Sequence, residues 1–376
     1  MILKKSNVES NNLRDNKVIF NEIEQIPEKD LKPVVPFACT SLIIKDKKGN
    51  VYHGRGMEFT TDLITSSLTY YPKDHVFQHY APDKSLGLKY VAKYPIIAIT
   101  DPVSEENPRG ATEGINQAGL AFSLNMIHNT GLPDPDPKDY SKTVPFMNIG
   151  EWALANFSTI EELKEGLKGN VVFWSESLSM LGNLKSPFHF AIYDKNGGSI
   201  VIEISNNNLN VYDNPTGVLT NGPEFPWHLE NLNNYSHLSN IDASASKIGN
   251  LTLIQPDSGI ATSALPSSST SVGRFIRAFY YSSFANSVDN PNEQIAELGH
   301  IMNNFDRPKN ITKDTSGEGE KSANNQYMTE FTVWTVLSDL SRAEFYIRMY
   351  GSLNYEKFTF DQFKDNTDFV SIPLAK

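Results

Sequence analysis

CTSLIIKDKKGNVYHGRGM, residues 39–57, predicts a β-hairpin. The run 39–44 is apolar and rich in β-branched side chains, which is typical of a buried strand. The cluster 46–50 has the composition of a turn, and the run 51–57 returns as a second strand. We therefore expect a buried strand that begins at Cys39, where the character of the chain changes abruptly.

The hairpin brings polar side chains near this cysteine. With the turn at its centre, Cys39 lies across from Met57, and Arg55 and Glu58 fall within a residue or two of it. Arg55 and Glu58 are three positions apart, so an unbroken strand would point them to opposite faces. A bulge at Gly56, or the end of the strand there, would bring both to one site.

Apolar patterning along the rest of the chain predicts an α+β fold. Strands come in runs and helices in pairs, which favours antiparallel sheets with helices packed outside over a doubly wound parallel sheet. The predicted strands are Tyr94–Ile99, Gly119–Leu124, His189–Tyr193, Ser199–Ile204, Leu209–Tyr212 and a hairpin of Phe331–Leu337 with Ala343–Met349. The predicted helices are Ser158–Leu167, opened by a Ser158/Glu161 capping box, Val272–Phe284 and Asn292–Phe305.

Residues 1–38 differ from the rest in composition. They are rich in Asn, Lys, Glu and Asp and end in the proline-broken run 32–36, so little there could build a core. We expect residues 1–38 to be a leader that is removed. No internal linker demands a split of the remainder, so residues 39–376 are expected to form a single catalytic domain.

The charge balance limits the partners. Asp and Glu total 44 against 33 Lys and Arg, a formal charge of −11, which argues against nucleic acid or an anionic membrane as the main partner. The sequence contains no run of about eighteen apolar residues, which is the length that a helix needs to span a bilayer. The start of the chain lacks the apolar region of a signal peptide, so the cytoplasm is the default compartment and localisation stays open.

Cys39 is the one cysteine in the sequence, which excludes an intramolecular disulfide and a multi-cysteine zinc site. A lone cysteine is commonly a small buried hydrophobe. A nucleophilic cysteine needs a base, and a Cys–His pair with His53 or His128 is one solution, although neither histidine carries a motif that accompanies a catalytic cysteine. In the other solution Cys39 becomes the first residue and uses its own α-amine, whose pKa is about 8. A leader that abuts a buried strand at a cysteine agrees with this second solution.

Seven sequence blocks carry a family resemblance, and they occur in order between residue 39 and about residue 350. The blocks are 39–41 (CTS), 54–59 (GRGMEF), 113–120 (EGINQAGL), 124–125 (LN), 152–158 (WALANFS), 217–223 (GVLTNGP) continuing to 227–228 (WH), and 273–277 (GRFIR). In this order they resemble the choloylglycine hydrolase family of N-terminal-nucleophile hydrolases, which holds bile salt hydrolases and penicillin V acylases. The resemblance implies a four-layered αββα sandwich of two antiparallel sheets with outer helices, and no metal or cofactor.

The resemblance also implies roles around the nucleophile. Cys39 is the nucleophile and its α-amine is the base. Arg55 lies near the sulfur, where its positive charge favours the thiolate. Glu58 takes the position of a family Asp that hydrogen-bonds the new α-amine.

Three further residues receive roles from the same resemblance. Asn221 supplies a side-chain donor to the oxyanion hole, and Asn125 supplies a backbone N–H. Each such donor is worth ~3 kcal/mol in the transition state. Arg274 completes the polar network around the nucleophile.

The sequence departs from the family pattern at three places. Glu58 is one methylene longer than the usual Asp, and catalytic geometry is sensitive to ~1 Å. The Gly-rich segment that borders the substrate pocket in the family is replaced by Ile260–Ser267, which keeps almost none of its glycines. The leader is longer than the usual short prepeptide, and the sequence does not say what removes it.

Several functions stay open at this point. The first is hydrolysis of a linear amide through a thioester, with a conjugated bile acid favoured because Asn125 stands where a penicillin acylase branch often has Tyr. Penicillin V and N-acyl homoserine lactones are the alternative substrates. The second function is an unprocessed, non-catalytic binding relative, and the third is a Cys–His thiol hydrolase. Relatives are often homotetramers, so the resemblance also implies that assembly.

Overall fold

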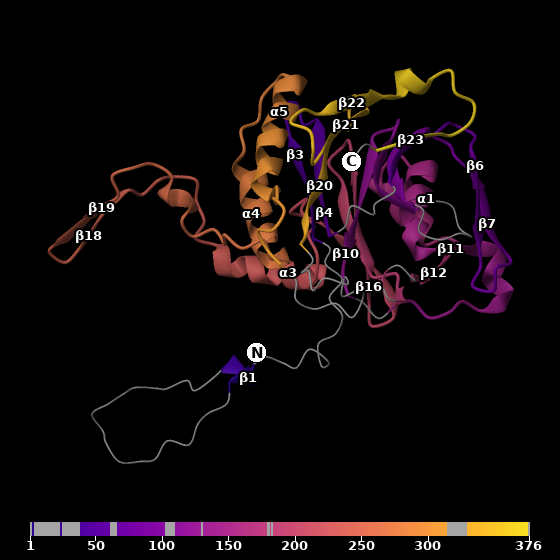
Figure 1. The fold of residues 1–376 in the computed structure, drawn as a ribbon, viewed down its shortest axis with the longest axis horizontal. Coiled ribbons are helices and arrows are strands. Elements are labelled where there is room, and N and C mark those ends of the chain that lie inside the picture. The colour runs from indigo at the N-terminus through magenta and orange to yellow at the C-terminus, as the bar shows by residue number, and fades with distance from the viewer. Residues whose placement is uncertain are drawn as a thin grey trace, which may run out of the picture.

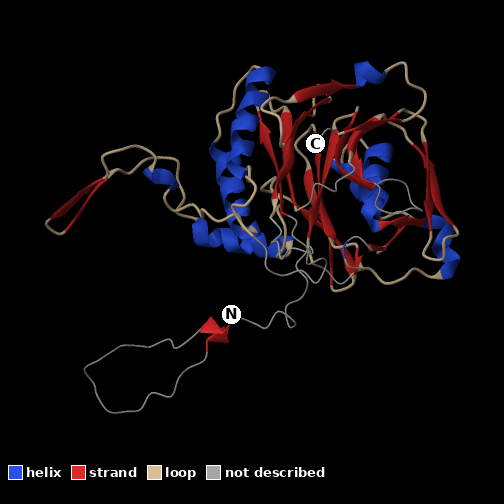
Figure 2. Cartoon of the chain, viewed as in Figure 1, coloured by secondary structure: helices blue, strands red, loops and turns tan. Residues whose placement is uncertain are grey.

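The computed structural model describes residues 38–60, 66–101, 110–128, 131–178, 181, 183–313 and 329–374, with two short paired strands, β1 (Ile2–Leu3) and β2 (Ile23–Glu24). Two antiparallel sheets lie face to face and helices cover their outer faces (Figures 1 and 2). The predicted α+β class and the αββα sandwich are therefore confirmed.

The first sheet carries the hairpin that begins at Cys39. Within the described residues it has five strands in the order β22 (Glu356–Thr359), β21 (Glu344–Met349), β20 (Phe331–Asp339), β4 (Val51–Phe59) and β3 (Ala38–Lys45). The turn between β3 and β4 forms because the Asp46 carboxylate accepts the backbone N–H groups of Lys48 and Asn50, both at 2.9 Å. This pairing fixes the register, and Cys39 lies opposite Met57 as predicted.

The second sheet has eight strands in the described part of the chain. Their order is β17 (Asn208–Asp213), β16 (Ser199–Ser205), β15 (Phe188–Asp194), β10 (Leu120–Met126), β9 (Gly110–Asn116), β8 (Ile96–Asp101), β5 (Ser67–Tyr71) and β23 (Val370–Pro373). Shorter pairs are β6 (Val76–Tyr80) with β7 (Leu86–Val91), β11 (Thr143–Pro145) with β12 (Val172–Trp174), and β13 (Ser177–Leu178) with β14 (Leu184–Lys185). The strands predicted from the sequence are all present, with bounds that differ by a few residues.

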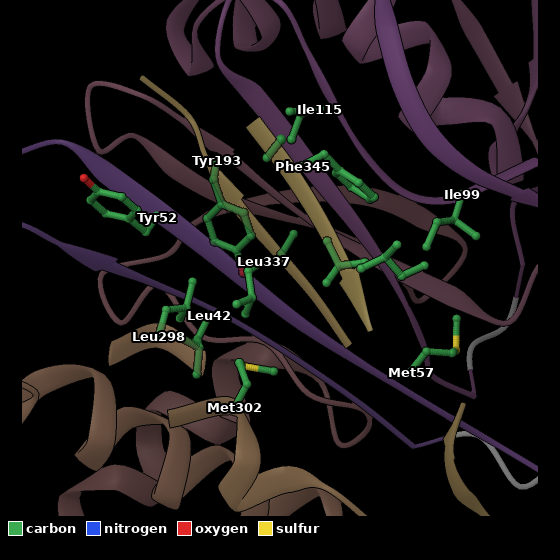
Figure 3. Close-up of a cluster of buried hydrophobic side chains, with 14 of the residues drawn as sticks. Leu42, Tyr52, Met57, Ile99, Ile115, Tyr193, Leu298, Met302, Leu337 and Phe345 are labelled. Atoms are coloured by element: carbon green, nitrogen blue, oxygen red, sulfur yellow. The ribbon is translucent and has the colours of Figure 1, made fainter. Parts of the chain in front are cut away.

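The core fills the space between the sheets and extends under the helices. Side chains of both sheets meet between them, including Tyr193, Ile99 and Phe345 (Figure 3). Burying one large apolar side chain contributes about 1.5–3 kcal/mol. On the outer face of the first sheet, Met302 packs over Gly54, where an added Cβ would lie 2.8 Å from the Met302 sulfur. Glycine at this position therefore lets the helix approach the sheet.

Helices α4 (Ser271–Phe284) and α5 (Pro291–Met302) cover the first sheet, and α1 (Ile149–Asn156) and α2 (Ile160–Leu167) cover the second. The predicted N-cap of α2 is wrong by one residue. Thr159, not Ser158, caps the helix, because its hydroxyl accepts the N–H of Glu162 at 3.2 Å while the Glu162 carboxylate bonds back to Ser158. Helix α5 ends at Met302 and continues as a 3-10 turn to Phe305.

A long arm projects away from the sandwich beside α3 (Phe225–Asn231) and α4 (Figure 1). Its end is a hairpin of β18 (Ala245–Ile248) and β19 (Leu251–Ile254), whose residues are all exposed. Across the described residues, no helix has the length and apolar character needed to cross a membrane.

Candidate active site

Cys39 is the second residue of β3 and its side chain is completely buried in the full-length chain. The Arg55 Nη2 atom donates to the Cys39 sulfur at 3.1 Å, and the Met57 sulfur lies 4.0 Å away. Burial raises the pKa of the Cys39 thiol, while the charges of Arg55 and Arg274 act in the opposite direction. The sulfur therefore lies in an apolar environment where two fixed cations favour the thiolate.

Arg55 is held from several sides. It donates to the Leu124 carbonyl at 2.8 Å and to the Gly56 carbonyl, and its Nε lies 3.7 Å from the Glu113 carboxylate. Arg55 and Glu113 have no exposed side-chain surface. Burial raises the pKa of Glu113, and the Arg55 charge lowers it. A guanidinium keeps its charge in such sites, so the geometry directs a permanent positive charge at Cys39.

Glu58 does not lie on the strand face that carries Arg55, and the predicted bulge at Gly56 is wrong. Strand β4 pairs with β3 without a break, so side chains three positions apart point to opposite faces. The irregularity lies in β20, between Thr332 and Trp334. The Thr332 hydroxyl donates to Glu58 Oε1 at 3.3 Å, and Glu58 Oε2 has no hydrogen-bond partner in the described structure.

Three arginines act against the effect of burial on the Glu58 carboxyl. Burial raises the pKa of this carboxyl, and the charges of Arg274, Arg55 and Arg307 lower it. Its register partner in β3 is Ala38, the residue that precedes the cysteine. Glu58 therefore lies across the hairpin from the residue that precedes Cys39.

Asn221 and Arg274 hold the backbone of the cysteine. Asn221 Oδ1 accepts the Cys39 N–H at 2.8 Å and Arg274 Nη2 at 2.6 Å. Arg274 also donates to the Cys39 carbonyl and, at 2.9 Å, to the Thr40 hydroxyl. The Asn221 amide donates one proton to the Met126 carbonyl at 2.9 Å. Since an amide nitrogen carries two protons, its second proton has no partner among the described residues.

Asn125 is the second-to-last residue of β10, a strand that contacts β3. The carbonyls on either side of it are bound by other site residues, Leu124 O by Arg55 and Met126 O by Asn221. The Asn125 amide itself donates to Leu219 O at 3.2 Å and to Thr220 O at 2.6 Å. The structure thus brings all six sequence-predicted residues to one end of β3.

The two histidines considered as bases lie elsewhere. His53 pairs with Ile43, four residues along β3 from Cys39, which corresponds to about 13 Å. Its Nε2 bonds the Ser123 hydroxyl at 2.9 Å, and burial lowers its pKa to about 3. His128 is exposed at the end of β10 and has no contact with Cys39. A Cys–His pair with either histidine is therefore not formed.

Glu113 is a site residue that sequence reasoning missed. It belongs to a resemblance block, yet no spacing pattern joins it to Arg55, because the two lie on different sheets. A carboxylate in a buried strand was the only available signal. Throughout the described ranges, no group of three or more His, Cys, Asp or Glu residues is arranged to hold a metal ion.

Comparisons with known proteins agree with this geometry. A model of linear amide C–N hydrolases of the choloylglycine hydrolase family matches residues 39–371. Bile salt hydrolase/transferase from Clostridium perfringens is 30% identical over 347 residues, 90% of this chain and 96% of that protein. A structure of a variant of conjugated bile acid hydrolase from the same organism has a TM-score of 0.74 at 25% identity, covering 90% and 98% of the two chains.

A second solved structure shares the fold at lower similarity. Penicillin V acylase from Agrobacterium tumefaciens has a TM-score of 0.66 at 20% identity, covering 86% of this chain and 87% of that chain. Together the fold and the family match define a linear amide C–N hydrolase with the Ntn hydrolase fold. The chain belongs to the choloylglycine hydrolase family.

Proposed function

We propose that residues 1–38 are removed and that residues 39–376 form one catalytic domain with Cys39 as its N-terminal nucleophile. The observation that carries the proposal is the environment of this residue, with Arg55 at 3.1 Å from its sulfur and Asn221 Oδ1 at 2.8 Å from its nitrogen. The family match supports it, because it begins at residue 39. Cleavage converts the Cys39 amide nitrogen into a primary amine at a position where Asn221 Oδ1 already accepts its N–H.

The chemistry follows from these positions. The α-amine takes the thiol proton, the Cys39 thiolate attacks the amide carbonyl, and a tetrahedral oxyanion forms. The second amide proton of Asn221 donates to that oxyanion. The backbone N–H of Asn125, to which the resemblance assigns the same role, points instead to His189 in the sheet. The ammonium returns its proton to the leaving nitrogen, the C–N bond breaks and a thioester remains. Water, deprotonated by the α-amine, then releases the acid and regenerates the thiol.

Glu58 and Arg274 complete this arrangement. Glu58 Oε2 is buried without a partner, and Glu58 lies opposite Ala38, the residue that precedes the bond to be cut. After cleavage it accepts a hydrogen bond from the ammonium, the role of the family Asp. Arg274 fixes the Cys39 carbonyl and the Asn221 amide together, so the nucleophile and the oxyanion donor keep their relative position.

The proposed substrate is a conjugated bile acid or a similar N-acyl amide. Relatives covered over most of their length are named bile salt hydrolase/transferase and conjugated bile acid hydrolase, which supports this class. Penicillin V and N-acyl homoserine lactones are the alternatives. The segment Ile260–Ser267 lacks the family glycines and is partly or fully exposed.

One observation favours the unprocessed binding relative as a second candidate: Cys39 is completely buried in the full-length chain. A turnover assay separates the two candidates. Glycine and taurine bile conjugates, penicillin V and N-acyl homoserine lactones are offered to the purified protein, with Cys39→Ala as the control. Hydroxylamine is added to intercept the thioester. Hydrolysis with hydroxamate formation supports the acylase, whereas no turnover, an intact leader and a cysteine inert to iodoacetamide overturn it.

We further propose that the chain forms a homotetramer through its arm. Ile241, Ile248 and Ile254 are at least 69% exposed, and an isolated two-stranded hairpin is barely stable in water. A second copy would cover these side chains. Light scattering should give four times the protomer mass, and Ile248→Ser with Ile254→Ser should reduce it; a monomeric wild type would contradict the assembly.

A further inference from the structure

The segment Leu219–Asn221 runs beside β3, and hydrogen bonds hold the backbone of each of its three residues. Leu219 exchanges two backbone hydrogen bonds with Ser41, at 2.8 and 2.9 Å. The Asn221 N–H donates to the Ser271 hydroxyl at 3.0 Å, at the start of α4. The two remaining carbonyls of the segment, those of Thr220 and Asn221, both accept from buried histidines that the proposed mechanism does not use.

His228 binds the carbonyl of Asn221 itself. Its Nε2 lies 3.0 Å from that oxygen, and since a carbonyl only accepts, Nε2 carries the proton. Burial lowers the pKa of His228 to about 4, so the ring is neutral and donates from this nitrogen alone. The ring stacks on Phe275 at a centroid distance of 4.5 Å and an interplanar angle of 15°. The stack fixes the plane in which the N–H points.

His189 binds the neighbouring carbonyl and is oriented by a carboxylate. Its Nε2 lies 3.0 Å from Thr220 O, and its Nδ1 lies 2.9 Å from Glu203 Oε2. The side chains of His189 and Glu203 are fully buried. Glu203 Oε2 also accepts the N–H of Phe225 at 3.1 Å, the first residue of α3. One carboxylate therefore fixes His189 and the helix that carries His228.

These contacts leave Asn221 a single orientation. Its backbone N–H and C=O are held by Ser271 and His228, and its side chain is held by Met126, Arg274 and the cysteine nitrogen. The unpartnered amide proton can then point in one direction only. A displacement of ~1 Å in such a donor costs up to about 100-fold in rate.

We propose that His228, together with the His189–Glu203 pair, positions Asn221 for the oxyanion. They are positioning residues, because neither histidine contacts the nucleophile. The inference rests on the proposed function, in which Asn221 stabilises the tetrahedral intermediate. It predicts that these residues act on kcat and leave substrate binding in the ground state nearly unchanged.

The test compares two substitutions of His228 in protein that is expressed with residues 1–38 and processed as the wild type is. His228→Phe keeps an aromatic ring against Phe275 and removes the N–H donor. We expect kcat to fall by about 10- to 100-fold with KM within about twofold. His228→Gln restores an amide donor, and we expect kcat to recover to within about threefold of the wild type. His300→Phe, on the exposed face of α5, is the matched control.

Intact mass and thermal melting are measured on each variant, so that loss of folding or processing is separated from loss of kcat. Glu203→Gln weakens the contact that orients His189, and we expect kcat to fall at constant KM in this variant as well. A wild type that turns over no amide would overturn the proposed function. An active wild type with an unchanged kcat in His228→Phe, or a loss that His228→Gln does not recover, would overturn the positioning role alone.

Discussion

Replacing Arg55 by Met should raise the pKa of the Cys39 thiol by an amount that follows from the distance between the two groups. The Arg55 Nη2 lies 3.1 Å from the Cys39 sulfur. At an effective dielectric constant of about 20, Coulomb's law gives about 5 kcal/mol for a thiolate at this distance, an upper limit near four pKa units. Glu113 shares the same guanidinium, its carboxylate 3.7 Å from Nε, which reduces the net effect. We therefore expect the Cys39 pKa to rise by about one to three units.

The assay is the rate of iodoacetamide alkylation of the processed protein as a function of pH, followed by mass spectrometry. Only the thiolate reacts, so the midpoint of the profile reports its formation. Arg342→Met serves as the matched control, because Arg342 pairs with Asp339 and Glu344 far along the sheet from the nucleophile. Its profile should match the wild type.

Arg55→Met also leaves the buried Glu113 without its cation, which costs about 3–5 kcal/mol of stability. The double variant Arg55→Met/Glu113→Gln removes that penalty and keeps an acceptor for the Trp334 indole N–H. The raised midpoint should persist in the double variant. A midpoint within about 0.3 unit of the wild type in both variants would refute the electrostatic role assigned to Arg55, since even the smallest expected shift is about one unit.

Three further changes test the site and the fold. Glu58→Gln removes a negative charge that raises the Cys39 pKa, so the acidic limb of the profile of kcat/KM against pH should move to lower pH by about one unit. A shift of this limb to higher pH would contradict the prediction. Burial raises the pKa of Glu151 to about 7, so the stability that this group contributes is fully present below pH ~4.5 and is lost as the pH rises through 7. The free energy of unfolding in urea should therefore fall by about 3 kcal/mol less over this pH range in Glu151→Gln than in the wild type. An equal fall in both proteins would argue against the raised pKa. Gly114→Ala should destabilise the sheet by about 1–3 kcal/mol, because its Cβ would lie 2.8 Å from the Ile97 carbonyl; an unchanged urea midpoint would show that β8 and β9 are less tightly paired.

The sequence predicted the nucleophile strand well because its signals are local. The apolar run, the turn and the returning strand fix the register, and that register places Arg55 beside Cys39. The cap of α2 was ambiguous, since Ser158 and Thr159 are each followed three residues later by a Glu. Only the folded chain decides between them.

Features that depend on distant partners could not be predicted. Helix α1 is buried on almost every side, so it has no polar face and no amphipathic period. Glu113 and His228 come from elements that touch the site only in the folded protein. The bulge was placed at Gly56 because the neighbouring strand β20, which carries the irregularity, is some 270 residues away.

The central claim is that the working enzyme begins at Cys39. Its most direct test is N-terminal sequencing with intact mass analysis of the protein fraction that shows amide hydrolysis. Our account predicts a chain of residues 39–376 with a free cysteine amine at its start. Full activity in a protein that still carries residue 38 joined to Cys39 through a peptide bond would contradict it.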